Sequence, residues 1–310
     1  MGWRFGFAKV AAQVSAFAED FCKRLRAPFS IFACLSQKVR HLRPSMLRLY
    51  PFLVPLFPRT HLVEEENNSV HLTILGRACG ESVLSFKSAM RLVELLKNYS
   101  AGTMTAEGFM AIVQALPESD DSYTPMFRSG TSETIRQRDA ASRFGDEIVR
   151  LLQRFVPNGD NFKYYARCKR AAVLYDWVHG VPTETIETNF KSRHPYYGNI
   201  EYGDIRNIAD LTRFQILSAF KIASLIFPGK MLDEEAIDKL LKQLEVGIPE
   251  EALYLLELLI TMTREEYLAI SKAGILNKEA LFNTEDEILK QIIEPESLER
   301  ITHIKNSQDN

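Results

Sequence analysis

Apolar residues recur every three or four positions along most of this chain, which is the spacing of an α-helix with one buried face. In residues 85–98, for example, Leu92 and Leu96 fall on the same side, and charged residues occupy positions between the apolar ones. The same pattern predicts helices over residues 105–116, 143–155, 162–179, 182–190 and 204–227, and the last third of the chain is helical too. We therefore expect a mostly α-helical fold.

One short stretch departs from the helical pattern. Residues 62–63 and 70–73 favour β-strands, and the polar residues 64–69 between them form a turn, which together is the pattern of a β-hairpin. Residues 1–50, which precede this stretch, are predicted to be helical. Helices followed by a hairpin are typical of a winged helix.

Loop-forming residues are most concentrated at positions 117–142, where Pro117, Pro125 and Gly130 lie among serines and aspartates. Such a run of helix-breaking and turn-forming residues predicts a flexible connection. The sequence leaves open whether this connection is also a domain boundary.

Composition and charge narrow the class of protein. The 310 residues are 46% hydrophobic and 25% charged, which is typical of a soluble globular protein and excludes disorder and collagen-like repeats. The net charge is only −2, but it is unevenly spread: basic residues exceed acidic ones by 8 in residues 1–60 and by 4 in 131–230, whereas acidic residues are in excess by 4 in 61–130 and by 10 in 231–310. A nucleic acid would be attracted to two segments and repelled by the tail.

Sequence motifs of common enzymes are missing. The Gly229-Lys230 pair lacks the upstream glycine and the following Ser or Thr of a phosphate-binding P-loop, so we expect no ATPase site. The chain has no HExxH or GxSxG sequence, and His179 is interpreted as a residue at a helix end rather than as a catalytic base. We expect no catalytic residue, no metal site and no cofactor in this chain.

Cysteine spacing and hydropathy bear on the compartment. The cysteines form no CxxC pair, which argues against a disulfide framework and a cysteine-based zinc site. They are Cys22, Cys34, Cys79 and Cys168. Residues 1–21 have the apolar spacing of an amphipathic helix rather than of a signal peptide, and no run approaches the roughly 18–20 apolar residues of a membrane span. We expect a cytoplasmic protein with no membrane partner.

Three ordered stretches resemble a known family. They are LTILGRA at 72–78, KRAAVLYDWVHG at 169–180 and YGDIRNI at 202–208. They are similar, in order and spacing, to the winged-helix junction, the alanine-rich helix and the start of the ratchet helix in Ski-like superfamily 2 helicases. The resemblance covers about residues 60–230. It implies a fold with a winged helix at 1–80 and a ratchet-like helical-bundle domain at 81–230.

The acidic tail at 231–310 resembles the helix-hairpin-helix element that follows the ratchet domain in this family. LEVGIPEE at 244–251 and the Ala-Gly-Ile sequence at 273–275 carry the likeness. The hairpin glycines are replaced by ITMT at 260–263, and Thr263 with Glu266 predicts a capping box at the start of the next helix. We expect this element to pack or to recruit a partner more often than to grip DNA.

The resemblance also suggests nucleic-acid-binding residues on the helix predicted at 204–227. An aromatic residue that stacks on a base corresponds to Phe214, and the family's arginine position is occupied by Asn207, with Arg206 and Arg213 nearby. Lys221 shares the helix face of Phe214 by its spacing. Because most of this helix is apolar, the alternative is that Phe214 belongs to the core.

Two further groups of basic residues are candidates for phosphate contacts. Lys163, Arg167 and Arg170 have the spacing of a stripe on one helix, with an ordinary solvated face as the alternative. In the predicted winged helix, Arg40 and Arg43 could contact a duplex backbone.

Both motor domains of the family are missing from the chain. The resemblance therefore implies a strand-guiding module for single-stranded or branched nucleic acid, in DNA repair or defence, with ATP and Mg²⁺ bound only by a motor subunit on a separate chain. The first alternative is a protein-interaction scaffold that retains the fold without nucleic-acid binding. The second alternative is a chain derived from a split or truncated gene.

Overall fold

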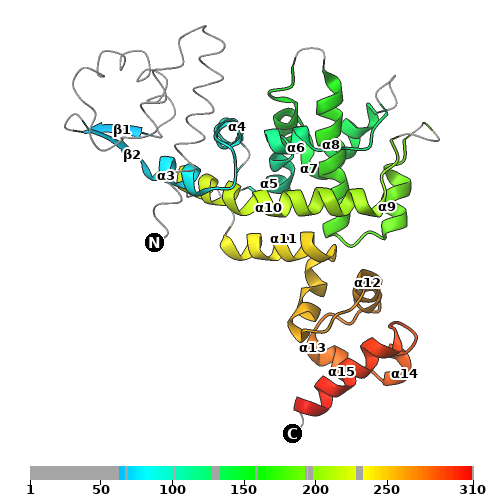
Figure 1. Cartoon of the computed structure of the whole chain (residues 1–310). Coiled ribbons are helices and arrows are strands. Elements are labelled where there is room, and N and C mark those ends of the chain that lie inside the picture. The colour runs from blue at the N-terminus through cyan, green and yellow to red at the C-terminus, as the bar shows by residue number, and fades with distance from the viewer. Residues whose placement is uncertain are drawn as a thin grey trace. The chain divides into compact units, whose positions relative to one another are not determined.

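The computed structural model describes residues 63–66, 69–100, 102, 104–127, 133–157, 160–192, 194, 198–227 and 233–308. Within these ranges the protein is mostly α-helical, as the sequence predicts, with one two-stranded hairpin (Figure 1). The N-terminal helices expected at residues 1–50, and with them Arg40 and Arg43, lie outside the described residues. The winged helix therefore stays a prediction.

The described residues fall into two compact units. The first contains residues 63–100 and 214–227, and the second contains residues 102–213 and 233–308. These units do not coincide with the three predicted domains. Helix α10 (Tyr202–Ile226) contributes to both units, and the acidic tail belongs to the second one.

The hairpin of the first unit pairs β1 (Val63–Glu66) with β2 (Ser69–Leu72) in an antiparallel register. Val63 pairs with Leu72, and Glu66 pairs with Ser69. The strands therefore extend into residues that the sequence pattern assigned to the turn, because backbone pairing continues through the polar positions 64–66.

Two capped helices follow the hairpin. Helix α3 (Ile74–Glu81) begins after Thr73, whose hydroxyl accepts a hydrogen bond from a backbone N–H of the first turn, and α4 (Phe86–Lys97) begins in the same way after Ser85. Helix α4 buries its apolar face, as its spacing predicts. The loop between them is tied to α10, because the backbone N–H of Val83 donates to Oγ of Ser218.

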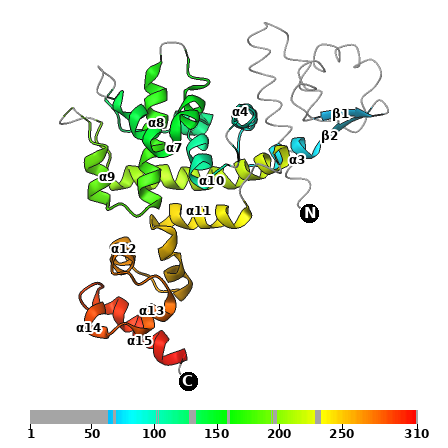
Figure 2. The same ribbon diagram turned by 180° about the vertical axis from the view of Figure 1, so that it is seen from behind.

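Helix α8 (Asn161–Val178) packs against α11 (Glu234–Val246) and four other helices of the second unit (Figure 1, Figure 2). The four are α5 (Ala106–Val113), α6 (Pro117–Asp121), α7 (Ile135–Gln153) and α9 (Thr183–Asn189). From residue 166 to residue 178, every side chain of α8 except Tyr175 is buried. Over these residues, α8 has no solvated face.

The expected flexible connection at 117–142 is wrong in part. Pro117 starts helix α6, because its fixed φ and missing N–H suit the first helical position. Helix α7 begins at Ile135, eight residues before the predicted start. Residues 135–142 are mostly polar, so apolar spacing predicted only the part of α7 from residue 143 onward. Within that part, Gly145 has a φ of +77° and breaks the regular backbone.

The acidic tail consists of helices, and those that follow residue 246 surround a small core of their own. They are α11 (Glu234–Val246), the 3-10 helix η3 (Glu250–Leu258), α12 (Arg264–Lys272), α13 (Lys278–Asn283), α14 (Asp286–Leu289) and α15 (Pro295–Gln308). The predicted capping box at the start of α12 is confirmed, with Thr263 and Glu266 each satisfying a backbone N–H of the other.

Trp177 of α8 joins the tail to the rest of the second unit. Its indole N–H donates to the carbonyl of Leu244 at 3.0 Å, and the guanidinium of Arg264 lies 4.2 Å from a ring centroid of Trp177. Gly247 passes so close that an added Cβ would lie 2.2 Å from the indole, and its φ is +79°. The tail is therefore anchored through contacts that require glycine at this position.

Candidate nucleic-acid interface

Helix α10 has one buried and one exposed face. Ile205, Ile216 and Ile222 are fully buried, whereas Phe214 is 64% exposed. The alternative that Phe214 belongs to the core is therefore wrong. The residue lies on the outer face because the apolar positions needed for packing are supplied by isoleucines and alanines on the opposite side of the helix.

Polar and apolar side chains share this outer face with Phe214. Asn207 and Lys221 are exposed, seven residues before and seven residues after Phe214. Leu217 and Leu225 are also exposed, at 45% and 46%. The face therefore combines an accessible aromatic ring with an amide, an amine and two leucines. We call these five residues the α10 face.

The predicted arginines beside Phe214 are bound to carboxylates and carbonyls. Arg206 donates to the backbone carbonyl of Glu245 and lies 3.9 Å from Asp210. Arg213 lies 3.4 Å from a carboxylate oxygen of Asp210 and 3.2 Å from one of Glu245. Each arginine is about one third exposed, so such ion pairs contribute at most about 1 kcal/mol. They nevertheless leave the guanidinium of Arg213 paired with two carboxylates.

The prediction of a basic stripe on α8 is wrong for Arg167 and Arg170, which are buried. The side chain of Arg167 is 0% exposed and forms two hydrogen bonds with Asp120, from Nε to Oδ1 at 2.7 Å and from Nη2 to Oδ2 at 2.6 Å. Its Nη1 also donates to the carbonyls of Leu152 and Arg154. Arg167 therefore ties α8 to α6 and to the end of α7, and cannot meet a phosphate in solution.

Arg170 is buried as well, as is its neighbour Lys169. Arg170 donates to the hydroxyl of Thr124 at 2.7 Å and to the backbone carbonyl of Gln114 at 2.9 Å. Burial lowers the pKa of Arg170 to about 10, which leaves the guanidinium charged at neutral pH.

Lys169 holds two loops through its amine. Nζ donates to the carbonyls of Pro125, at 2.5 Å, and Gly198, at 3.0 Å. Burial lowers the pKa of Lys169 to about 8. Its role is therefore structural, since both bonds are to backbone carbonyls of neighbouring segments.

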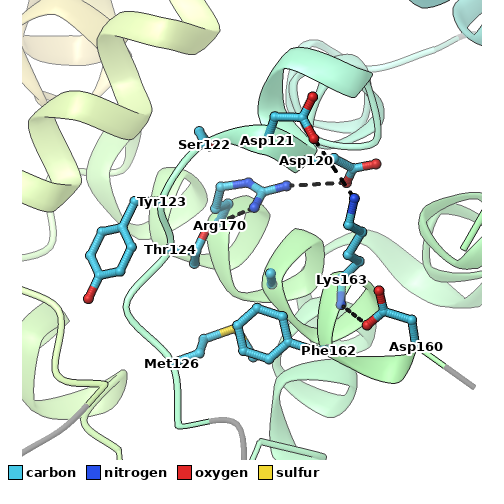
Figure 3. A pocket seen from close by; sticks show the side chains of 11 residues that line it. Asp120, Asp121, Ser122, Tyr123, Thr124, Met126, Asp160, Phe162, Lys163 and Arg170 are labelled. Atoms are coloured by element: carbon cyan, nitrogen blue, oxygen red, sulfur yellow. Dashed lines mark hydrogen bonds and ion pairs between the residues drawn. The ribbon is translucent and has the colours of Figure 1, made fainter.

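Lys163 remains accessible at the rim of a pocket of about 600 Å³ in the second unit (Figure 3). Tyr123, Phe162 and Met126 supply its apolar lining. The remaining lining residues are Asp120, Asp121, Ser122, Thr124, Asp160, Ala166 and Arg170. Because three carboxylates stand against two cations, and Lys163 lies 3.9 Å from Asp121, the pocket does not favour a phosphate.

His179 ends helix α8, as expected. It is the C-cap residue, its ring stacks on that of Tyr175 with centroids 4.0 Å apart, and its Nδ1 lies 2.8 Å from the carbonyl oxygen of Tyr175.

Within the described part of the chain, no cluster of three or more His, Cys, Asp or Glu residues could hold a metal ion. Nor does any helix in those ranges combine the length and apolar character needed to cross a membrane.

Sequence reasoning missed the carboxylates that control these arginines. Asp120 lies 47 residues from Arg167 along the chain, and Glu245, whose carboxylate pairs with Arg213, lies 32 residues from it. Spacing within a helix gives no signal for such distant partners.

Comparisons with protein-family models and with curated proteins find no match to this chain.

Proposed function

We propose that this protein binds single-stranded or branched nucleic acid with the α10 face and guides the strand by stacking a base on Phe214. The observation that carries this proposal is the 64% exposure of the Phe214 ring on a long, continuous helix. An exposed aromatic side chain is the usual platform for an unpaired base, and such stacking contributes about 1–3 kcal/mol per base.

The finer fold assignments and the cellular role belong to this proposal. Residues 1–80 would form a winged helix, residues 81–230 a ratchet-like domain, and the tail a helix-hairpin-helix element without its DNA-binding glycines. The chain would act in the cytoplasm with a helicase motor subunit, which would bind ATP and Mg²⁺. The hairpin of β1 and β2 and the long helix α10 are compatible with this arrangement.

Stacking, rather than charge, would dominate the affinity. Arg206 and Arg213 are paired with carboxylates, and Arg167 and Arg170 are buried, so Lys221 is the cation that the α10 face offers. Each phosphate contact changes the slope of log affinity against log salt by about −0.7 for a single strand. We therefore expect a shallow slope, close to that of one contact.

The test is fluorescence anisotropy with a labelled single strand of about 12 nucleotides, as DNA and as RNA. Phe214→Ala should weaken binding roughly tenfold, which corresponds to about 1.4 kcal/mol. Tyr123→Ala, at an exposed aromatic residue outside the α10 face, is the matched control and should change affinity less than twofold. Equal affinity of wild type and a folded Phe214→Ala variant would remove the stacking proposal.

A second candidate function, a protein-interaction scaffold, is favoured by a different observation. Leu217 and Leu225 extend the exposed apolar surface around Phe214, while the nearby arginines are bound to acidic residues. Such a surface suits a protein partner as well as a base. A pull-down that recovers no partner, together with tight nucleic-acid binding that Phe214→Ala weakens, would count against the scaffold.

A further inference from the structure

An apolar groove of about 660 Å³ lies in the acidic tail, between the turn that follows η3 and helix α15. Leu259, Ile260 and Thr261 form one side of the groove, and Ile304 with His303 lies on the other. We call this surface the tail groove. The α10 face shares no residue with it, so the two surfaces can be tested independently.

Leu259 is unusual in both backbone and exposure. Its φ is +55°, in the left-handed region where glycine is the favoured residue, and its side chain is 92% exposed. Both features are unfavourable in the isolated protein, since the backbone conformation is strained and the apolar side chain lies in water. A strained residue at the edge of a groove is a common feature of binding sites.

The turn that carries Leu259 is held rigidly on both sides. Arg300 of α15 donates to the carbonyl of Thr261 at 2.9 Å, and the hydroxyl of Tyr267 donates to the carbonyl of Ile260 at 3.0 Å. The backbone N–H of Leu259 bonds to the carbonyl of Leu256. The exposed leucine is therefore presented in a fixed position, which lowers the entropy cost of binding a partner.

The surroundings of the tail groove are acidic. The lining itself carries Glu299 beside Arg300 and His303. Around it, Glu257 and Glu296 are exposed on the two elements that form the groove. The segment 231–310 carries ten more acidic than basic residues. A nucleic acid would be repelled by this potential, whereas a partner bearing Lys or Arg would be attracted.

The secondary structure of the tail favours a helical partner over an extended one. Among the described residues 233–308 there is no strand, so a peptide has no strand edge to pair with. An amphipathic helix, by contrast, places apolar residues at every third or fourth position into a groove and exposes its charged residues at the rim.

We propose that the tail groove binds a Lys/Arg-rich amphipathic helix of a partner protein. Leu259 packs among the apolar residues of the partner helix, and Glu299 with its acidic neighbours meets the basic residues. This interaction goes beyond the proposed strand contact and does not depend on Phe214.

The test uses the full chain and a synthetic helical peptide of about four turns, with leucines at the positions of one face and lysines elsewhere. Binding is followed by fluorescence anisotropy of the labelled peptide. Leu259→Gly should weaken binding about tenfold while the fold is kept, because glycine suits the left-handed backbone. Leu276→Ala, at an exposed leucine outside the groove, is the control and should bind as wild type does.

Charge reversal gives a second, independent readout. Glu299→Lys should weaken peptide binding several-fold, whereas Glu279→Lys, an exposed site outside the groove lining, should have less than a twofold effect. A peptide with Glu in place of Lys should not bind. Unchanged affinity for both Leu259→Gly and Glu299→Lys, or equal binding of the acidic peptide, would overturn the proposal. Phe214→Ala should leave peptide binding intact, so failure here is separate from failure of strand binding.

Discussion

Helix α8 buries charged side chains, whereas helix α10 exposes an aromatic one. In α8, the cations Arg167, Lys169 and Arg170 are buried, with exposures of 1% or less. In α10, the aromatic ring of Phe214 is largely in solvent. Both helices carry basic and apolar residues at helical spacing, so their sequences alone do not reveal this difference.

The difference comes from how much of each helix is covered. Helix α8 packs against five helices of its unit, and its charges are stabilised because each finds carboxylates or backbone carbonyls within the interior. Helix α10 keeps one face in solvent, where an aromatic side chain has no core to enter. Basic spacing on a helix therefore indicates a ligand surface only when that helix is known to have an open face.

The largest effect is expected when the buried charge pair of α8 is broken. Arg167→Met leaves Asp120 without its main partner and should lower the free energy of unfolding by about 3–5 kcal/mol. The measurement is urea unfolding followed by fluorescence in a Trp3→Phe background, in which Trp177 is the reporter. Lys163→Met, four residues earlier on a more exposed position, is the control and should cost less than about 0.5 kcal/mol. A loss below 1 kcal/mol for Arg167→Met would contradict the structural role of the pair.

The next effect is a pH dependence set by Lys169. Its pKa is lowered from 10.5 to about 8 in the folded protein, so between these values the unfolded chain binds a proton that the folded chain has lost. The free energy of unfolding should therefore rise with pH. Between pH 7 and pH 9, the free energy of unfolding of the wild type should rise by about 1 kcal/mol more than that of Lys169→Met. A difference that stays constant over this range would show that Lys169 has an ordinary pKa.

A smaller effect, on affinity for a single strand, is expected when Arg213 beside Phe214 loses a carboxylate partner. Glu245→Gln removes one carboxylate from Arg213 and should raise affinity for a labelled single strand about threefold at low salt, with a steeper salt dependence. Glu250→Gln is the control. It removes a carboxylate of the following helix η3 that is paired with Lys239 instead of Arg213, and it should leave affinity unchanged. Equal affinities of wild type and Glu245→Gln would mean that Arg213 does not lie on the path of the strand.

The smallest effect is expected for stability at Phe214. Phe214→Ala should change the free energy of unfolding by less than about 0.5 kcal/mol, because the ring is exposed and alanine favours helix. Ile216→Ala, two residues away on the buried face, should cost about 2–5 kcal/mol. If both substitutions cost the same in urea unfolding, the α10 face is not exposed as the structure has it.

Much of the fold could be predicted because it depends on neighbours in sequence. The helical spacing of residues 85–98 located α4, and the Thr263–Glu266 pattern located the start of α12. The start of α7 was missed because residues 135–142 are mostly polar and carry little apolar spacing. Of the candidate site, the exposure of Phe214 could not be predicted, because the spacing of α10 is equally consistent with a buried ring.

The sequence by itself determined which segments are helical, where several of them begin, and how charge is divided along the chain, because these properties arise from residues a few positions apart. Only the tertiary structure decided that Arg167 meets Asp120, that Arg213 meets Glu245, and that Leu259 stands in solvent on a left-handed turn. The physical reason is that the burial of a charge or a ring depends on which distant segments pack around it, and spacing along one helix carries no information about them.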